Sequence, residues 1–142
     1  MSSNKKFLLD TDIVIDLIKN RFKLWDKVKN VGILNCYVSE ITIAELHFGV
    51  HYSSRTEKHK NEPFEIAESF NVLPISDILE IFGKEKARLT QSGNRIPDFD
   101  LVIAVTAVKN DLIMVTGNIK HFNRVNKLVL ENWRKPDFNE FL

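Results

Sequence analysis

The sequence predicts an α/β fold with a mainly parallel central sheet, because short apolar runs alternate along it with segments of helical periodicity. Phe7-Leu8-Leu9 is wholly apolar, as expected of a strand buried on both faces, and residues 112–115 form a similar run late in the chain. Between them, Ile43, Leu46 and Val50 recur at the spacing of one helical face. Strands that alternate with helices form parallel sheets with helices on both faces, so we expect a central sheet of four to five strands.

The other elements follow from the same patterns, taken in chain order. A helix should begin after Asp10, with Thr11 or Asp12 as its N-cap. Ser76 can cap a long helix that Gly93-Asn94 ends. The expected strands cover residues 7–9, 34–39, 71–75 and 112–115, with an edge strand at 128–130; the expected helices run to Ile18 and then cover 24–28, 42–50, 64–70, 76–92 and 99–109, the last opened by Pro97, while polar residues 53–63 form a loop or a frayed helix end.

At 142 residues the chain is expected to form one domain, residues 1–142, which folds without a disulfide or a structural metal. The net charge of +1 does not exclude a nucleic-acid partner, because the arrangement of the charges decides this. The single cysteine, Cys36, lies in an apolar run and is expected to be buried, in a reducing compartment. Asp10, Asp12 and Asp16 interrupt the apolar N-terminal stretch, so no signal peptide is expected; with no long apolar run, we expect a cytoplasmic protein.

Acidic residues fall where predicted strands end or predicted helices begin. Asp10 directly follows the first strand, and ligands of open parallel sheets bind outside the carboxyl ends of the strands, although capping of the next helix explains this residue equally well. Glu45 follows the second strand, but with Thr42 it fits a capping box. Asp98 and Asp100 lie in a first helical turn, where acids favour the helix dipole; if Asp98 is the cap, Asp100 is not needed for that purpose.

The loop of residues 116–118, Thr-Gly-Asn, follows a further strand and is expected at the same edge, unless it is a plain turn. Together these residues predict several carboxylates in one cleft. Such groups repel each other and raise each other's pKa unless a cation is present. Oxygen ligands suit Mg²⁺ or Mn²⁺ with waters completing the shell, and such an ion can activate water and neutralise charge on a phosphodiester.

Five stretches of the chain, in this order, form a further pattern: 7–17 (Phe-Leu-Leu-Asp-Thr-Asp-Ile-Val-Ile-Asp-Leu), 41–49 (Ile-Thr-Ile-Ala-Glu-Leu-His-Phe-Gly), 96–107 (Ile-Pro-Asp-Phe-Asp-Leu-Val-Ile-Ala-Val-Thr-Ala), 112–125 (Leu-Ile-Met-Val-Thr-Gly-Asn-Ile-Lys-His-Phe-Asn-Arg-Val) and 130–133 (Leu-Glu-Asn-Trp). Each motif alone is modest, but with all of them at these spacings the chain resembles the VapC-type PIN-domain ribonucleases, the toxins of bacterial VapBC toxin–antitoxin pairs. The resemblance implies a three-layer α/β/α fold and a magnesium-dependent endoribonuclease, with Mn²⁺ as a possible substitute. It also implies a homodimer that a cognate VapB-type antitoxin inhibits.

The resemblance also assigns the candidate site residues, which are the three family acids Asp10, Glu45 and Asp100, the extra acid Asp98 of many members, Thr116 near the site, and Asn118 in the place of a fourth aspartate. Thr11 matches the small polar residue after the first acid. The hypothesis is that Asp10, Glu45 and Asp100 hold Mg²⁺, that Asp98 and Asn118 complete or border the metal site, and that water attacks an RNA phosphate in line. The products would carry 5′-phosphate and 3′-hydroxyl ends.

An acidic site needs a basic rim to hold RNA. Among the cations near the predicted edge, which include Lys19, Arg21 and Lys23, we favour Arg95, Lys120 and Arg124 as RNA-binding residues. Related toxins cut transfer RNA or ribosomal RNA, so one of these is the expected substrate.

Two other functions stay open at this point. Asp10 and Asp12 also resemble the nucleophile and the acid–base of haloacid-dehalogenase-like phosphatases, although the later acids fit a nuclease better. A PIN-like domain can also bind RNA or protein without catalysis. Phe48, Phe64 and Phe82 are expected in the core, but exposed aromatic residues among residues 42–70 could instead face a partner subunit or antitoxin.

Overall fold

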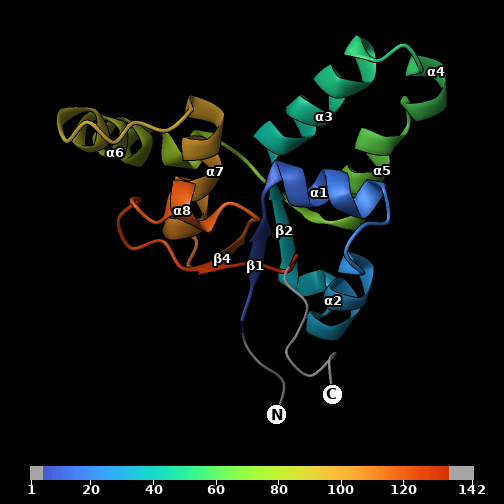
Figure 1. The fold of residues 1–142 in the computed structure, drawn as a ribbon, viewed down its shortest axis with the longest axis horizontal. Helices are drawn as coiled ribbons and strands as arrows, with labels where there is room; N and C mark the ends of the chain where they lie inside the picture. Colours follow the sequence, from blue (N-terminus) through green and yellow to red (C-terminus); the bar gives the residue numbers. More distant parts are fainter. Residues whose placement is uncertain (1–4, 135–142) are drawn as a thin grey trace.

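The computed structural model describes residues 5–134 and contains a five-stranded sheet with the order β3-β2-β1-β4-β5, in which all four pairings are parallel (Figure 1). The strands are β1 (Phe7–Leu9), β2 (Cys36–Ser39), β3 (Asn71–Leu73), β4 (Ile113–Val115) and β5 (Leu130–Glu131). The α-helices are α1 (Thr11–Ile18), α2 (Leu24–Val31), α3 (Glu40–Tyr52), α4 (Thr56–His59), α5 (Glu62–Ser69), α6 (Leu79–Gln91), α7 (Asp98–Lys109) and α8 (Ile119–Phe122). The predicted α/β fold with a parallel sheet is confirmed.

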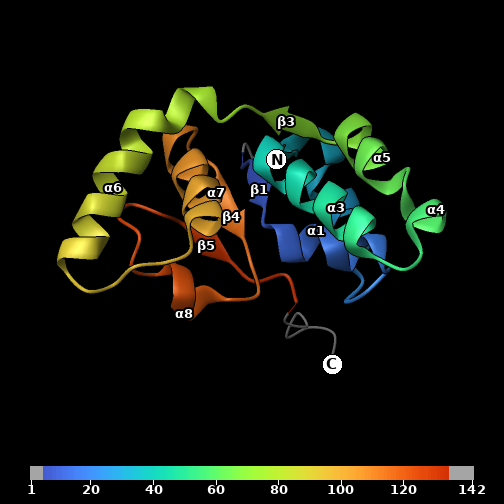
Figure 2. The same cartoon turned by 90° about the horizontal axis from the view of Figure 1, so that it is seen from above.

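The sheet separates two hydrophobic cores, because successive residues of a strand point to opposite faces. Phe7 and Leu9 of β1 belong to a core completed by α1, α2, α3 and α5, whereas Leu8 belongs to a core completed by α6, α7 and α8. Seen from above, the two groups of helices lie on either side of the strands (Figure 2). The expected three-layer α/β/α arrangement is therefore present.

The strand order places a topological switch point between β1 and β4. β2 and β3, which follow β1 in the chain, lie on one side of it in the sheet, and β4 and β5, which come later, lie on the other side. Leu9 is paired with Val115, so β1 and β4 end at the same level. In open parallel sheets, the loops that leave such a pair of strands diverge and leave a crevice at the carboxyl edge.

Several expected boundaries differ from the structure, mostly at helix starts. Residues 53–63 are not simply a loop, since they contain α4 and the start of α5. Ser76 does not cap the long helix: it begins a 3₁₀ turn, Ser76–Ile78, and α6 starts at Leu79 without a side-chain cap. Likewise the second strand starts at Cys36, after a 3₁₀ turn at Ile33–Asn35. Short 3₁₀ turns therefore precede β2 and α6 at positions where the sequence pattern predicted the element itself or its side-chain cap.

The burial of particular side chains tests the predicted core. Cys36 is fully buried, and burial raises the pKa of its thiol to about 11, which makes it unreactive at neutral pH. Phe82 packs partly buried against the core of α6 and α7. Phe48 and Phe64 were wrongly expected in the core, since 68% and 61% of their surfaces are exposed. On α3 the buried positions are Leu46 and Val50, and a residue midway between them faces the other side of the helix.

Among the described residues, no helix is both long enough and apolar enough to cross a membrane.

Candidate active site

Asp10 lies at the switch point, between the ends of β1 and β4. Its backbone N–H donates to the carbonyl oxygen of Val115, 3.0 Å away, which extends the β1–β4 pairing by one step. Its side chain is 5% exposed, and both carboxylate oxygens are hydrogen-bonded: Oδ1 accepts from the Thr11 N–H at 2.8 Å and Oδ2 from the Thr116 hydroxyl at 2.9 Å. Asp10 is also the N-cap residue of α1, so the expected cap at Thr11 or Asp12 was wrong. The two explanations of Asp10, helix cap and buried site residue, therefore hold together.

Glu45 reaches the same region from α3. The predicted capping box does not form, because α3 begins at Glu40 and Ser39 caps it by accepting from the Ile41 N–H at 3.1 Å. Glu45 instead accepts a 2.7 Å hydrogen bond from the Thr11 hydroxyl at its Oε1. A hydroxyl has one hydrogen, so the 2.9 Å contact between Thr11 and Thr42 has the Thr42 hydroxyl as donor. A chain of hydrogen bonds thus joins Thr42 to Thr11 and Thr11 to Glu45.

Asp100 comes from the first turn of α7, and its neighbour Asp98 points elsewhere. Oδ2 of Asp100 lies 3.2 Å from Nε2 of His121 on α8. Asp98 forms an ion pair with Lys86 of α6, 3.0 Å away, with 51% of its side chain exposed. Because Pro97 occupies the N-cap position, neither aspartate caps α7 through its side chain.

These carboxylates interact electrostatically. Burial, followed by repulsion from Asp100 and Asp12, raises the pKa of Asp10 from 3.8 to about 7, even though its two hydrogen bonds oppose the shift. Burial and the same two acids raise the pKa of Glu45. The pKa of Asp100 is also raised, mainly by burial and then by Asp12, against the lowering effect of His121. We call Asp10, Asp12, Glu45 and Asp100 the carboxylate cluster.

The donor chemistry of the carboxylate cluster fits a hard divalent cation. Within residues 5–134, no three or more His, Cys, Asp or Glu side chains are already grouped tightly enough to hold a metal ion by themselves. Mg²⁺, however, is usually held by one or two carboxylates and keeps several waters, so it needs no all-protein cage. A cation would also relieve the repulsion that raises these pKa values. The residues are therefore suited to an ion bound partly through water.

The remaining predicted residues divide between the site and its surroundings. Thr116 is buried at the site, and its hydroxyl oxygen accepts from the Asn118 N–H at 3.1 Å while donating to Asp10. The side chain of Asn118 is exposed at the same loop. Arg95, Lys120 and Arg124 are exposed.

Sequence reasoning missed two members of this region. The only site role considered for Asp12 was that of the acid–base of a phosphatase, although it lies two residues after Asp10, where the first helix begins. His121 had no signal of its own, because its link to Asp100 joins residues 21 positions apart.

An acidic site at the switch point of a three-layer parallel α/β fold matches a known family. The profile of the PIN domain family matches residues 7–128, so the chain belongs to the PIN-domain family, and its relatives place it with the VapC-type members. Ribonuclease VapC2 of Haemophilus influenzae is 36% identical over 136 residues, covering 90% of this chain and 98% of the relative. The tRNA(fMet)-specific endonuclease VapC of Shigella flexneri is 31% identical, with 90% and 98% covered. A DNA-bound VapBC structure from Salmonella typhimurium aligns with a TM-score of 0.83 at 28% identity, covering 91% of this chain and 98% of the other.

Proposed function

We propose that this protein is a divalent-metal-dependent endoribonuclease that acts as the toxin of a toxin–antitoxin pair and cleaves transfer or ribosomal RNA. The observation that carries the proposal is the carboxylate cluster, in which burial and then neighbouring acids raise the pKa of Asp10, Glu45 and Asp100, three residues from separate elements. Perturbed carboxylates in such a place are typical of catalytic sites. The names of the relatives, a ribonuclease and a tRNA(fMet)-specific endonuclease, support RNA as the substrate.

In this proposal Asp10, Glu45 and Asp100 hold the cation, Mg²⁺ or Mn²⁺, with Asp12 adding negative charge nearby. When bound, the ion supplies positive charge for the phosphodiester and lowers the pKa of a bound water. The protein keeps the ligands in place: Thr116 orients Asp10, and the Thr42–Thr11 chain orients Glu45.

Further positioning roles belong to two residues around the cluster. His121 orients Asp100 through its 3.2 Å contact. Asn118 steadies Thr116 through its backbone N–H, whereas Asp98 forms its ion pair with Lys86 and has no ligand or positioning role in this proposal.

The surroundings of Asp10 favour a metal ligand over a phosphatase nucleophile. A nucleophilic carboxylate must present an oxygen to the incoming phosphate. In Asp10 both oxygens already accept hydrogen bonds, and the side chain is 5% exposed. Asp10 is a buried carboxylate with other acids nearby, so it is better suited to binding a cation through its remaining lone pairs than to attacking a phosphate.

The same proposal includes a VapB-type antitoxin as partner and a homodimer as assembly. Solved structures similar to this chain, among them VapBC2 of Rickettsia felis bound to a promoter DNA fragment, are VapBC assemblies. A groove of about 700 Å³ runs between α1 and α3, lined by Ile15 and Ile18 on one side and by Glu45 and Gly49 on the other. A segment seated there would contact Glu45 and would obstruct the site.

The proposal is tested by RNA cleavage with the purified protein and its Asp10→Asn variant. We expect the wild type to cleave transfer RNA or ribosomal RNA with Mg²⁺ or Mn²⁺, to stop in EDTA, and to leave 5′-phosphate ends. Asn is also a good N-cap, so Asp10→Asn should keep the fold while activity falls about 100-fold or more.

The matched control is Asp26→Asn, which removes an exposed aspartate from the first turn of α2. It should cleave as the wild type does. Cleavage that persists in EDTA or in Asp10→Asn, or products with 2′,3′-cyclic phosphate ends, would contradict the proposal.

A further inference from the structure

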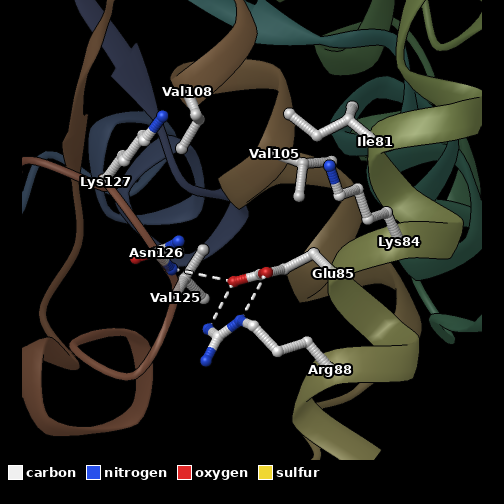
Figure 3. Close-up of a pocket in the computed structure, with 9 residues that line it drawn as sticks. All are labelled: Ile81, Lys84, Glu85, Arg88, Val105, Val108, Val125, Asn126 and Lys127. Atoms are coloured by element: carbon white, nitrogen blue, oxygen red, sulfur yellow. Dashed lines mark hydrogen bonds and ion pairs between the residues drawn. The ribbon is translucent and has the colours of Figure 1, made fainter.

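A second feature is a cavity of about 340 Å³, open to solvent, that α6, α7 and the loop after α8 line (Figure 3). Its floor is apolar and is formed by Ile81, Val105, Val108 and Val125. The side chains of Lys84 and Lys127 extend over this floor from opposite walls (Figure 3). The cavity thus has an apolar base and a cationic rim.

The loop that carries this rim is tied to α6 by a buried carboxylate. Glu85 is 8% exposed, and Arg88 donates to both of its oxygens, at 2.8 and 2.7 Å. Glu85 Oε2 also accepts from the Asn126 N–H at 2.8 Å, and Arg88 donates to the carbonyl oxygen of Arg124 at 2.9 Å. Two backbone groups of the loop are therefore anchored, and the negative charge of Glu85 is neutralised internally.

The cations that remain on this surface have no acidic partner. Within residues 5–134, none of the side chains of Lys84, Arg95, Arg124 and Lys127 forms an ion pair with a carboxylate, and all four are exposed. Arg124 donates only to the carbonyl oxygen of Asn94, at 3.4 Å. Lys127 has a φ of 63°, a left-handed conformation that costs energy for a residue with a side chain. Among the described residues, these four exposed cations are therefore left without a carboxylate to neutralise them.

A short stretch of chain connects this surface to the carboxylate cluster. His121 of α8 contacts Asp100, and the chain runs from α8 directly through Arg124 to Lys127. Lys120 is exposed on the same short helix. We expect a polyanion whose reacting phosphate lies at the cluster to extend along α8 toward the cavity.

We propose that Lys84, Arg95, Lys120, Arg124 and Lys127, here called the basic ridge, bind RNA phosphates remote from the cleaved bond, and that the Glu85–Arg88 pair holds the ridge in shape. The inference rests on the proposed ribonuclease function and adds a second contact site to it. Exposed lysines and arginines attract RNA through its phosphates, whatever the base sequence. The ridge thus favours long or structured RNA over short oligonucleotides that reach only the cluster.

The test measures RNA binding in an Asp10→Asn background, where the RNA stays intact. The double variant Lys84→Glu/Lys127→Glu should bind a full-length transfer RNA about 10-fold or more weakly. Each lost phosphate contact should also reduce the slope of log affinity against log salt concentration by about 0.7 to 0.9. Binding of an oligonucleotide of a few residues should not change.

Two further variants separate loss of charge from loss of structure. Lys84→Arg/Lys127→Arg keeps the charges and should bind transfer RNA as the parent does. Lys29→Glu/Lys58→Glu makes the same change in charge at exposed positions on α2 and α4 and should have a much smaller effect. An equal loss of transfer-RNA affinity in this control would show a general effect of net charge and would overturn the proposal that the basic ridge binds RNA.

The remaining outcomes distinguish failure of the ridge from failure of the proposed function. If the wild type cleaves neither long nor short RNA, the ribonuclease proposal fails. If the wild type cleaves long and short RNA, and Lys84→Glu/Lys127→Glu changes neither cleavage nor transfer-RNA binding, the ribonuclease proposal stands and only the proposed role of the basic ridge fails. A variant that binds RNA normally but loses affinity for the antitoxin would reassign this surface to an acidic protein segment and would also overturn the inference.

Discussion

Asp10 and Glu85 are both buried carboxylates, 5% and 8% exposed, yet their pKa values are shifted in opposite directions. Asp10, at the switch point of the sheet, has a pKa raised to about 7, chiefly by burial. Glu85, on α6, has a pKa below its usual value, chiefly because Arg88 donates to it. Each accepts hydrogen bonds at both oxygens, so the number of hydrogen bonds does not explain the difference.

The difference lies in the charge of the neighbours. Asp10 has neutral donors, Thr11 and Thr116, and further acids nearby, whereas Glu85 has a guanidinium. Asp16 also has a cationic neighbour, since it is 3% exposed and accepts a hydrogen bond from the Arg134 guanidinium at 2.7 Å. A buried acid with a cationic partner holds elements together. One without a partner destabilises the fold unless a cation binds, which marks it as a functional group.

The largest expected effect on stability is from Asp10→Asn in the metal-free protein. The folded-state pKa of about 7 exceeds the unfolded value of 3.8, so the folded state binds more protons between them, and stability falls as pH rises through this window. Removing the charge should therefore stabilise the protein at pH 8, by up to about 4 kcal/mol, and by much less at pH 4. Urea unfolding at both pH values in EDTA measures the difference. A variant less stable than the wild type at pH 8 would show that Asp10 has an unrecognised cationic partner.

Glu85→Gln should change the free energy of unfolding in the opposite direction, and by a smaller amount. The amide keeps the shape but loses the charge that Arg88 binds, so we expect destabilisation by about 1–2 kcal/mol at pH 7. Because the folded pKa is lowered from 4.5, the contribution is present above that value and is lost as pH falls through the folded pKa. The gap between variant and wild type should thus close in acid.

The matched control for this pair is Glu57→Gln. Glu57 lies 3.0 Å from Lys60 at the same sequence spacing, but 87% of its side chain is exposed. Exposed ion pairs contribute little, so its unfolding should match the wild type within about 0.5 kcal/mol. If both variants lose the same amount, burial is not what makes the Glu85–Arg88 pair stabilising.

The smallest expected effect is a change in the pKa of Asp10 in Thr116→Val, a variant that removes one neutral hydrogen-bond donor from this carboxylate. The pKa of Asp10 should rise further, by about one unit, because a hydrogen bond to the charged form contributes about 1 kcal/mol. Carboxyl carbon chemical shifts in the metal-free protein report this value directly. Thr106→Val is the control, since the Thr106 hydroxyl donates to the Val102 carbonyl within α7, and it should leave Asp10 unchanged.

Sequence patterns predicted the strands better than the helix starts. The runs at 7–9 and 112–115 are apolar throughout because both faces of these strands are buried, and this signal is local. The start of α3 was placed at Thr42, and Thr42 and Glu45 fit a capping box. In the structure Ser39 caps the helix, and tertiary hydrogen bonds to Thr11 use both residues. A side chain that can serve a local or a distant partner cannot be assigned from spacing alone.

By itself the sequence determined the α/β class, the parallel sheet and the acids that stand at the ends of its elements, since these follow from periodicity along the chain. Only the tertiary structure decided which acids interact. Asp12 joined Asp10, Glu45 and Asp100, while Asp98 turned to Lys86 and Glu85 to Arg88. The reason is physical: the pKa of a carboxylate depends on burial and on charges a few ångströms away, and folding brings those charges from distant parts of the chain.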